Sequence, residues 1–497
     1  MPVQYFTAEE VRAAERTTGD LLTNGTLMRR AAYGVAQAVI AEFTRTGGCY
    51  GRRVAVVAGA GDNGGDGLFA GAELARRGVS VVALLLNPAK AHSDGLAALM
   101  RSGGHVVSQL PARLDAVIDG VVGIGGRGPL RPEAAEVFAA LDPRVTVVAV
   151  DLPSGVDADT GQINVPAVRA DLTVTFGVLR RAHLLAAPQC GRIALVDIGL
   201  GPEEHVGAHL LSNSSAAQDG APIAMSEPAT HLYSLTDDEI AQAWPVPGAH
   251  DDKYTQGVLG VIAGSHRYPG AAILCSGAAV TATSGMTRYV GSAHAEVVNR
   301  FAEVVAVPEL ADAGRVQAWV IGPGAGTDDA ALDRLRAVLA TDLPVLVDAD
   351  ALTLIAAHHD LVIGRDAPTL LTPHAGEFAR LSGEPVGPDR CSAVADLAHR
   401  WGVTILLKGR ITLVAQSDGI VYGNDAGASW AATAGAGDVL AGIAGALLAA
   451  GLPPSWAGAA AARVHARAAT LAAQGAPIGA SNLLAALRPA IRELLTA

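Results

Sequence analysis

The sequence is poor in aromatic residues and in cysteine. Phe, Trp and Tyr together make up 4% of its 497 residues, so the interior must be packed mainly with small and β-branched side chains. The four cysteines, Cys49, Cys190, Cys275 and Cys391, lie far apart and form no C-x-x-C pair. This spacing disfavours a zinc site or a disulfide scaffold and predicts free thiols in a reducing compartment.

The sequence also lacks a membrane-spanning run and an excess of basic charge. The uncharged stretch Val439–Leu452 is too short to cross a bilayer, and Pro453 ends it. Near the N-terminus, Glu9 and Glu10 stand where a secretion signal would need basic residues. The net charge of −12 disfavours binding to nucleic acid or to an acidic membrane. We therefore expect a cytoplasmic protein without nucleic-acid or membrane partners.

The composition is sufficient for two large folded domains. Half of the residues are hydrophobic and 17% are charged, which suits large buried sheets. A chain of this length exceeds the usual size of one hydrophobic core. From residue 201 the sequence GPEEHVGAHLLSNSSAAQDGAPIAMSEPA has no sustained period, which is typical of a linker. We expect one domain over residues 1–220 and a second over residues 230–497.

The first half contains a strand–turn–helix–strand pattern. Apolar strands are predicted at Arg53–Ala58 and Val79–Leu86, with a glycine-rich loop over Gly59–Gly67 and a helix over Leu68–Arg77 between them. This βαβ unit predicts a parallel sheet. The loop has the G-x-G-x-x-G spacing of dinucleotide sites, but the second strand ends at Asn87 without the usual acidic residue. An ordinary dehydrogenase cofactor site is therefore disfavoured.

Polar groups lie at the ends of three predicted strands of the first half. They are Asp62, Asn63 and Asp66 in the glycine-rich loop, Asp119 in the final turn of the strand at 114–122 that leads into GIGGRGP at 123–129, and Asp151 and Ser154 after the strand at 145–150. The carboxyl ends of parallel strands lie at one sheet edge, so these groups predict one cleft. Oxygen ligands from Asn63, Asp119 and Ser154 suit a monovalent or divalent cation. The alternative is a set of ordinary tight turns with capping Asp residues.

The second half again alternates apolar strands with glycine-rich polar loops, which predicts another α/β domain. Its most informative segment is Gly435–Asp438 (GAGD), followed by an apolar helix over Val439–Leu452. The free N–H groups and the positive dipole at such a helix start suit a phosphate. Asp438 beside a seated phosphate is placed to take a proton from an attacking hydroxyl. The simpler alternative is an Ala/Gly-rich turn in which Asp438 is the helix N-cap.

Two further side chains of the second half leave alternatives open. Lys408, at the end of a predicted strand, is a charge partner for phosphate or a surface lysine. His374 binds a ligand or caps the helix that contains Glu377. No G-x-x-x-x-G-K-[ST] sequence occurs, so a nucleotide in this domain would use the GAGD turn and the Lys408 strand end.

These motifs resemble those of known families. The second half resembles the ribokinase-like group, and within it the NAD(P)H-hydrate dehydratases. The supporting segments are residues 257–274 (GVLGVIAGSHRYPGAAIL), 322–326 (GPGAG), 347–352 (VDADAL), 372–381 (TPHAGEFARL), 407–412 (LKGRIT) and 435–442 (GAGDVLAG). The first half resembles the NAD(P)H-hydrate epimerases through residues 59–67 (GAGDNGGDG), 119–129 and 150–161 (VDLPSGVDADTG). The domain order is that of the bifunctional bacterial repair enzymes.

The resemblance implies an α/β architecture of two three-layer αβα domains, Rossmann-like and then ribokinase-like. It also implies a repair reaction on NADH or NADPH hydrated at C6 of the nicotinamide ring. The epimerase interconverts the R and S forms, and the dehydratase restores the S form while ADP, or ATP, with Mg²⁺ supplies the phosphate; ADP yields AMP and phosphate. A homo-oligomer such as a tetramer is implied as well.

The resemblance also assigns roles to individual residues. In the epimerase, the hydrate would contact Asp62, Asn63, Gly64, Gly65, Asp66, Gly123, Ile124, Gly125, Gly126, Arg127, Gly128, Pro129 and Asp151. Potassium would lie on Asn63, Asp119 and Ser154, and Asp119 is also a catalytic candidate. In the dehydratase, Asp438 would be the base, with the hydrate on Ala272, Gly326, His374 and Asp438. The nucleotide would contact Lys408, Gly409, Arg410, Ile411, Thr412 and Gly437.

Two segments depart from the family pattern, and two rival functions remain open. Asp62 stands where the epimerase loop commonly has asparagine, and residues 284–288 (SGMTR) replace a Ser-Gly-Ala-Gly segment. One rival is a vitamin or sugar kinase of the ribokinase type fused to a ligand-binding domain. The other is a first half that acts as a nucleotide sensor or an interaction module without catalysis.

Overall fold

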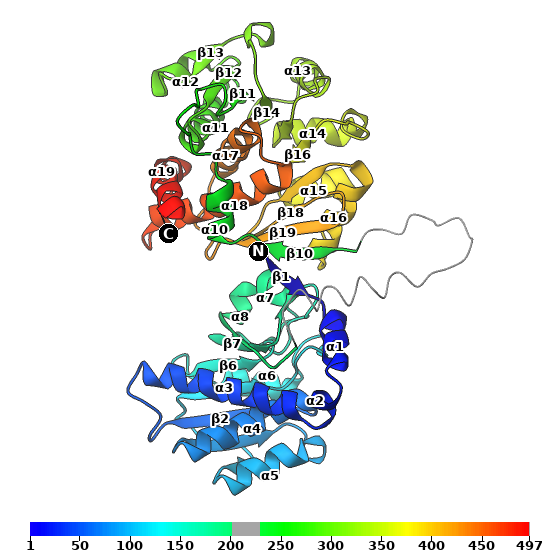
Figure 1. Cartoon of the computed structure of the whole chain (residues 1–497), viewed down its shortest axis with the longest axis vertical. Helices are drawn as coiled ribbons and strands as arrows, with labels where there is room; N and C mark the ends of the chain where they lie inside the picture. Colours follow the sequence, from blue (N-terminus) through cyan, green and yellow to red (C-terminus); the bar gives the residue numbers. More distant parts are fainter. Residues whose placement is uncertain (201–228, 497) are drawn as a thin grey trace, which may run out of the picture. The chain divides into compact units, whose positions relative to one another are not determined.

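The computed structural model describes residues 1–200 and 229–496 (Figure 1). The chain forms two compact units, one over Gln4–Ile223 and one over Ala224–Ala497 together with Met1–Val3. The predicted linker, which begins at residue 201, falls almost wholly outside the described residues.

A parallel seven-stranded sheet forms the centre of the N-terminal unit. Its order is β4-β3-β2-β5-β6-β7-β9, with bounds His105–Val107, Ser80–Leu85, Arg53–Ala58, Ala116–Gly120, Thr146–Val150, Leu172–Phe176 and Arg192–Val196. The strand order reverses between β2 and β5, as in a Rossmann-like sheet, which leaves a crevice at their carboxyl ends. The predicted parallel α/β sheet is confirmed. The strand β4 and the short pair of β1 (Val3–Phe6) with β8 (Leu179–Arg180) were not predicted.

Alternate residues of these strands point to opposite faces of the sheet. In β2, Val54 and Val56 pack with residues of α3 (Thr26–Thr44), α4 (Asp62–Arg76) and α5 (Ser93–Arg101). Ala55 and Val57 face the other side, where α6 (Pro132–Ala139) packs. Figure 1 shows α3, α4 and α5 side by side. The remaining helices are α1 (Ala8–Thr17), α2 (Asp20–Thr23), α7 (Arg181–Leu185) and α8 (Ala187–Cys190).

The glycine-rich segment after β2 is mostly helix, so the loop predicted over Gly59–Gly67 is wrong in its second part. Helix α4 begins at Asp62, six residues before the predicted start at Leu68. A Cβ added to Gly64 would lie 2.5 Å from the backbone oxygen of Gly59, and one added to Gly67 would lie 3.1 Å from Val56. These glycines therefore allow the first turns of α4 to pack against the sheet rather than opening a loop.

The C-terminal unit has a second, mostly parallel sheet. Along β13-β12-β11-β14-β15-β16-β17-β18-β19-β10, the bounds are Val305–Val307, Met286–Val290, Val258–Ile262, Ala318–Ile321, Val345–Val347, Thr369–Leu371, Thr404–Leu407, Ile411–Ala415, Ile420–Asp425 and His231–Ser234. Only β17–β18 and β18–β19 pair antiparallel among these strands. The α/β class predicted for this half is confirmed. The segment 284–288, which departs from the family pattern, runs into β12, the second strand from the β13 edge of the sheet.

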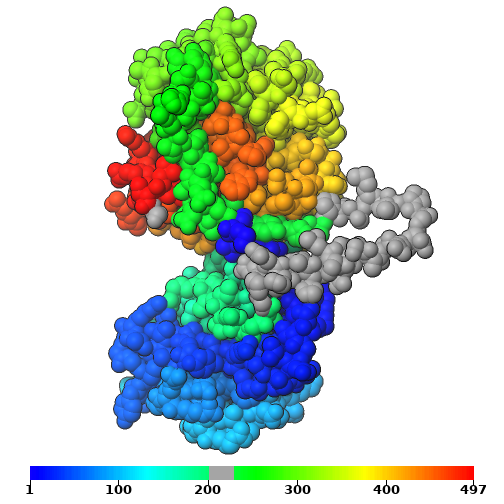
Figure 2. All heavy atoms as spheres, in the orientation of Figure 1, coloured from blue at the N-terminus to red at the C-terminus, as the bar shows by residue number. Residues whose placement is uncertain are grey.

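Two groups of helices accompany this sheet. The core on one face joins strand residues such as Val261 and Val320 to α11 (Pro269–Ala282), α17 (Ala436–Ala449), α18 (Pro454–Ala473) and α19 (Ala480–Thr496). The remaining helices are α10 (Asp237–Ala243), α12 (His294–Arg300), α13 (Asp329–Leu339), α14 (Asp350–Ala357), α15 (Ala375–Ser382) and α16 (Arg390–Trp401), and α16 packs on β17 and β18. Orange residues of this unit reach the surface between its green and yellow-green elements (Figure 2).

Helix α17 is the long apolar helix predicted after the GAGD motif. It begins at Ala436 and ends at Ala449, slightly earlier at both ends than the predicted Val439–Leu452. Gly435 precedes it with φ +84°, a conformation that favours glycine, and a Cβ there would also lie 2.5 Å from Leu274. The backbone therefore requires glycine before the helix that carries Asp438.

The structure also bears on the cysteines and on the search for a membrane-spanning helix. No disulfide joins any of the four cysteines, as expected from their spacing. Within residues 1–200 and 229–496, no helix combines the length and the apolar character needed to cross a membrane.

Candidate active sites

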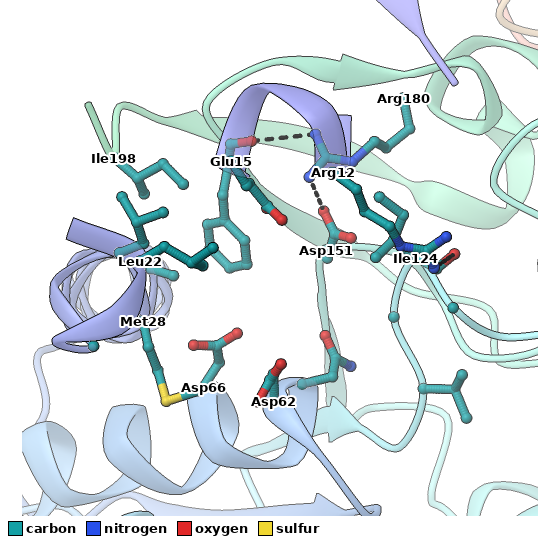
Figure 3. Close-up of a pocket in the computed structure, with 18 of the residues that line it drawn as sticks. Arg12, Glu15, Leu22, Met28, Asp62, Asp66, Ile124, Asp151, Arg180 and Ile198 are labelled. Carbon is teal, nitrogen blue, oxygen red and sulfur yellow. Dashed lines mark hydrogen bonds and ion pairs between the residues drawn. The ribbon is translucent and has the colours of Figure 1, made fainter. Parts of the chain in front are cut away.

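A cavity of about 660 Å³ opens at the crevice of the N-terminal sheet (Figure 3). It lies where the strand order reverses, because its wall includes Ala60 and Asp62 after β2 and residues 121–125 after β5. Seven of the predicted hydrate-binding residues line it, namely Asp62, Asn63, Asp66, Gly123, Ile124, Gly125 and Asp151. Of the others, Gly64 and Gly65 are buried in α4, while Gly126, Arg127, Gly128 and Pro129 continue the segment after β5 outside this lining.

Sequence reasoning missed part of the cavity wall. Arg12 and Glu15 come from α1, and Arg180 comes from the strand β8. An apolar wall adds Leu22, Leu27, Met28, Ala31, Phe176 and Ile198. No local motif marks these positions. The wall forms because residues 12–31 meet Phe176, Arg180 and Ile198, which lie more than a hundred residues further along the chain. The sequence of α1 does not show what the inner face of this helix borders.

Asp119 lies behind this cavity rather than among its lining residues. Its carboxylate is fully buried and accepts hydrogen bonds from Ser154 Oγ at 2.7 Å and from the Ser154 amide at 2.8 Å. The amide of Val121 donates a third bond at 3.2 Å. Burial raises the pKa of Asp119 to about 6, although these hydrogen bonds counteract it. Asp119 and Ser154, predicted to share a cation, are thus in direct contact.

The donor set fits a hard monovalent cation. It consists of the Asp119 carboxylate, the Ser154 hydroxyl and the side-chain oxygen of Asn63; Nδ2 of Asn63 is a donor that cannot bind a cation, and it is buried without a partner among the described residues. A Cβ added to Gly123 would lie 2.7 Å from Asn63 Oδ1, so the segment after β5 reaches Asn63 closely. Among the described residues, no group of three or more His, Cys, Asp or Glu side chains is placed to hold a metal. Oxygen ligands with a single carboxylate suit potassium better than a divalent ion.

Asp151 is held in an unusual conformation at the cavity wall. Its φ of +63° is uncommon for a residue with a side chain, and its carboxylate accepts bonds from Thr175 Oγ1 and Arg180 Nη2, each at 3.0 Å. His183 supports the backbone, with Nε2 2.8 Å from the Asp151 carbonyl oxygen. The amide of Arg180 donates to His183 Nδ1 at 2.9 Å, so the proton of the neutral ring lies on Nε2. Burial lowers the pKa of His183 to about 4.

The C-terminal unit gathers its predicted polar residues at the start of α17. Asp438 lies in the first turn, and Lys408 Nζ approaches Gly437 so closely that a Cβ there would lie 3.6 Å away. Lys408 Nζ also donates to Asp348 Oδ1 at 2.7 Å. Burial and then the Asp348 carboxylate raise the pKa of Asp438 to about 7, although Lys408 lowers it. A carboxylate with this pKa is suited to accept and release a proton near neutrality.

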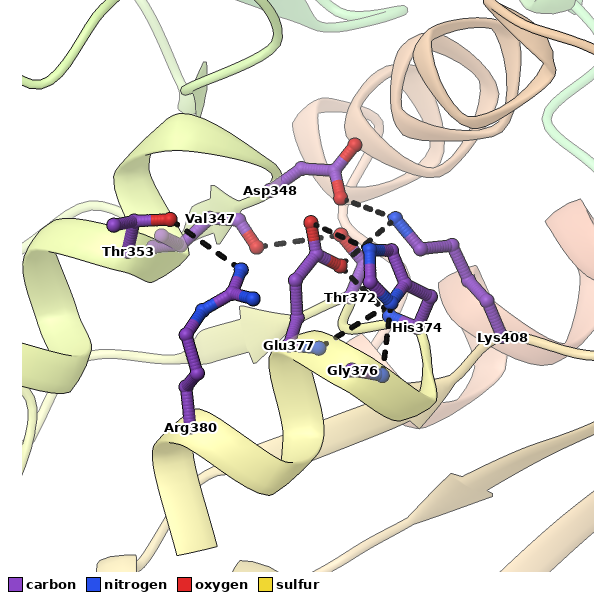
Figure 4. A network of polar contacts seen from close by, with 9 residues as sticks. All are labelled: Val347, Asp348, Thr353, Thr372, His374, Gly376, Glu377, Arg380 and Lys408. Carbon is purple, nitrogen blue, oxygen red and sulfur yellow. Dashed lines mark hydrogen bonds and ion pairs between the residues drawn. The ribbon is translucent and has the colours of Figure 1, made fainter. Parts of the chain in front are cut away.

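Lys408 is enclosed by carboxylates (Figure 4). Besides Asp348, Glu377 Oε2 lies 3.6 Å from its Nζ, and both acids are buried. Burial lowers the pKa of Lys408, but these two carboxylates outweigh that effect, so the pKa is raised. The reading of Lys408 as a solvated surface lysine is therefore wrong.

His374 caps helix α15. Its Nδ1 accepts hydrogen bonds from the amides of Gly376 at 2.9 Å and Glu377 at 3.2 Å, and Glu377 Oε2 accepts one from the His374 amide at 2.7 Å. Of the two roles left open by the sequence, the structure thus has the cap. The exposed side of the ring is compatible with a ligand contact, which stays a prediction.

The other predicted ligand residues lie nearby along the chain or at strand ends. Lys408, Gly409 and Arg410 form the turn between the antiparallel strands β17 and β18, and Ile411 and Thr412 open β18. The amide of Gly326 donates to Asp350 Oδ2 at 2.9 Å. Ala272 is fully buried in α11, so its expected contact with the hydrate stays a prediction.

One residue behind Asp438 was missed from the sequence. His465 of α18 places its Nε2 2.9 Å from the carbonyl oxygen of Ala436, the first residue of α17. Burial lowers the pKa of His465 to about 4, so its ring is neutral near pH 7. The His465 ring therefore supports the first turn of α17 through the Ala436 carbonyl and adds no charge to the site.

Comparison with known proteins agrees with this geometry. Residues 259–489 match the NAD(P)H-hydrate dehydratase family, and residues 24–182 match the YjeF-related protein N-terminus family. The bifunctional NAD(P)H-hydrate repair enzyme Nnr of Mycobacterium tuberculosis (strain ATCC 25618 / H37Rv) is 56% identical over 451 residues, which cover 90% of this chain and 90% of that protein. The chain belongs to the bifunctional NAD(P)H-hydrate repair enzymes.

Further relatives support membership in this repair-enzyme family. The enzyme of the same description from Mycobacterium leprae (strain TN) is 53% identical and covers 99% of each chain. A ribokinase-like superfamily protein of Enterococcus faecalis V583 aligns with a TM-score of 0.50 and 24% identity, covering 56% of this chain and 100% of that one. This likeness shows the ribokinase-like fold. The resemblance inferred from the GAGD and GAGDNGGDG motifs is thereby confirmed.

Proposed function

We propose that this chain repairs hydrated NADH and NADPH in the cytoplasm. The N-terminal unit interconverts the R and S epimers, and the C-terminal unit converts the S form to the intact cofactor as ADP yields AMP and phosphate. The observation that carries the proposal is Asp438, whose pKa is near 7. It stands at the start of an apolar helix and near the partly buried ammonium group of Lys408.

In the dehydratase reaction Asp438 acts as the base. It takes the proton of the C6 hydroxyl while that oxygen attacks the terminal phosphorus of ADP, so the O–P bond forms and AMP leaves. The C6–O bond then breaks with departure of phosphate, and loss of the C5 proton restores the ring double bond. Phosphate is a far better leaving group than hydroxide. The N–H groups at the start of α17 and Lys408 stabilise the charge of the transferred phosphate.

The other residues that would contact the nucleotide and the hydrate are those at the positions of the family motifs. The nucleotide is held by Lys408, Gly409, Arg410, Ile411, Thr412 and Gly437, and the hydrate by Ala272, Gly326, His374 and Asp438. Mg²⁺ would be bound mainly by the nucleotide phosphates, because the described residues offer no cluster of three or more acidic side chains or histidines for it. ATP is an alternative phosphate donor at the same site.

In the epimerase unit, the cavity holds the hydrate, with Asp62, Asn63, Asp66 and Asp151 at its polar wall and residues 123–129 beside it. Asn63, Asp119 and Ser154 would hold potassium, whose positive charge would offset the buried carboxylate of Asp119. Asp119 thus contributes to the reaction through this cation. The full chain is expected to form a homo-oligomer such as a tetramer.

Separated R and S hydrates provide the test. With purified full-length protein and ADP, the S form should be consumed with recovery of absorbance at the NADH band and with equal amounts of AMP and phosphate. A kinase would instead leave a stable phosphorylated product. The R form should be consumed through epimerisation, and Asp119→Ala should abolish that consumption. Unchanged R consumption would contradict the proposed epimerase site.

A further inference from the structure

Two carboxyl groups face each other across the epimerase cavity. Glu15 projects into it from α1, and Asp66 projects from α4 on the opposite side (Figure 3). Both residues line the same cavity of about 660 Å³, so a ring bound in it would lie between the two carboxyl groups.

Asp66 is buried in a way that points to a ligand. The residue exposes 9% of its surface, and its Oδ1 is buried without a hydrogen-bond partner in the described structure. Burial raises its pKa well above the ordinary value, and the carboxylates of Asp151, Asp62 and Glu15 raise it further. A buried carboxyl oxygen without a partner costs free energy, which a bound substrate group would recover.

The position of Glu15 is set by the packing of α1. Thr7 and Glu10 form a capping box at the start of this helix, while Val11 and Ala14 are buried on its inner side. Glu15 follows one turn after Val11, so it lies beside that inner side and at the cavity. Burial raises the pKa of Glu15, and the nearby Arg180 guanidinium partly counteracts this.

We propose that Glu15 and Asp66 are the acid–base pair that inverts C6 of the hydrated nicotinamide ring. The inference rests on the epimerase function proposed above and names the groups that carry it out. Carboxyl groups on opposite sides of a planar ring reach both faces of one carbon, as interconversion of two epimers requires. The cavity lining also includes Arg12, while Asp62 and Asp151 add negative charge.

The pair shares one proton. With Asp66 protonated and Glu15 ionised, Asp66 donates its proton to the C6 hydroxyl of one epimer, and the C6–O bond breaks so that water leaves with the bonding electrons. The N1 lone pair forms a C6=N1 double bond, which makes the ring a planar cation. The carboxylates of Asp62 and Asp151 favour this positive charge.

Water restores the hydroxyl on the opposite face. A second water molecule attacks C6 from the Glu15 side, its electron pair forms the new C6–O bond, and Glu15 takes the proton that it loses. The other epimer is formed, one water has replaced another, and the proton now lies on Glu15. The reverse reaction starts from that state, and exchange with solvent returns the pair to its first state.

Two variants test the roles of the pair. Glu15→Gln and Asp66→Asn keep the side-chain volume but remove the proton transfer. Interconversion of separated R and S hydrate is measured without ADP, after subtraction of the uncatalysed rate. Each variant should lose about a hundredfold or more in rate, the usual contribution of general acid–base catalysis. Glu9→Gln is the matched control, because Glu9 is exposed on the same helix and pairs with Arg16 at the surface.

A second measurement needs no variant. In water enriched in oxygen-18, each inversion by the unaltered protein should place one labelled oxygen at C6. Inversion without incorporation of label would overturn the proposal, as would full interconversion rates in both variants. Circular dichroism and thermal unfolding, compared with the Glu9→Gln control, report whether the N-terminal unit of each variant is folded. If the unaltered protein fails to interconvert the epimers, the proposed epimerase function fails instead.

Discussion

Lys408 Nζ lies 2.7 Å from Asp348 Oδ1, and this ion pair stands beside the acid Asp438. The two partners act on Asp438 in opposite directions. Burial first, and Asp348 next, raise the pKa of Asp438 to about 7, whereas Lys408 lowers it. Burial and this ion pair together therefore set the pH at which the proposed dehydratase base becomes ionised.

Dehydration should weaken below neutral pH. Asp438 has to be ionised to take the hydroxyl proton, and its pKa is about 7. The kcat/KM for S hydrate should therefore fall tenfold for each pH unit below about 7. A pH–rate profile at saturating ADP measures it. A flat profile between pH 5 and pH 7 would contradict the role of Asp438 as base.

Changes to the ion pair should move this profile in opposite directions. Asp348→Asn removes a carboxylate that raises the pKa of Asp438, so the acid limb should move down by about one pH unit. Lys408→Met removes a cation that lowers the same pKa, so the limb should move up by a similar amount. Asp333→Asn, at an exposed site on α13, serves as the control. Equal shifts in one direction would exclude the proposed electrostatic roles.

Potassium should stabilise the protein more at high pH than at low pH. The pKa of Asp119 is raised from its ordinary value of 3.8 to about 6, so its contribution to stability is complete below 3.8 and is lost as pH rises through 6. A bound cation offsets that loss. Replacing choline chloride with potassium chloride should raise Tm at pH 8 but hardly at pH 5.

The Asp119→Asn variant provides the control for this experiment. It removes the buried charge, so the difference in Tm between the two salts should disappear at pH 8. If the variant keeps the full potassium effect, the ion binds elsewhere. Thermal unfolding followed by circular dichroism is sufficient to measure both proteins.

His183 should act as a positioning residue for Asp151. His183→Gln perturbs the hydrogen bond to the Asp151 carbonyl oxygen and should destabilise the unit by about 1–3 kcal/mol in urea unfolding. Because Asp151 lines the cavity, the KM for epimerisation should rise more than kcat falls. His105→Gln, at an exposed position of β4, should leave both unchanged. A variant with the stability and KM of the unaltered protein would exclude this role.

The strands and the GAGD helix could be predicted because their signals are local. β2 spans the residues expected from its apolar run, and α17 begins within three residues of the predicted Val439. The start of α4 could not be predicted, because glycines that usually open a loop serve helix–sheet packing there. This packing brings α4 against the strands β2 and β5, and a strand distant in sequence such as β5 is not visible in the local pattern.

Some residues of the candidate sites could likewise be predicted from local motifs, and others could not. Asp62, Asn63 and Asp438 follow strands or open helices in glycine-rich segments, so motif spacing finds them. Glu15 and His465 sit within ordinary helices, and their sequence neighbours carry no motif. Their importance comes from what their helices pack against, which no local pattern encodes.

The most direct test of the account is the ADP-dependent repair assay with the unaltered chain and Asp438→Asn side by side. The measurement is the initial rate at which NADH absorbance returns from pure S hydrate, together with the AMP released. The unaltered chain should form AMP and NADH in equal amounts, and the variant should lose at least about a thousandfold in rate. Repair by Asp438→Asn at the unaltered rate would contradict the role of Asp438 as the base.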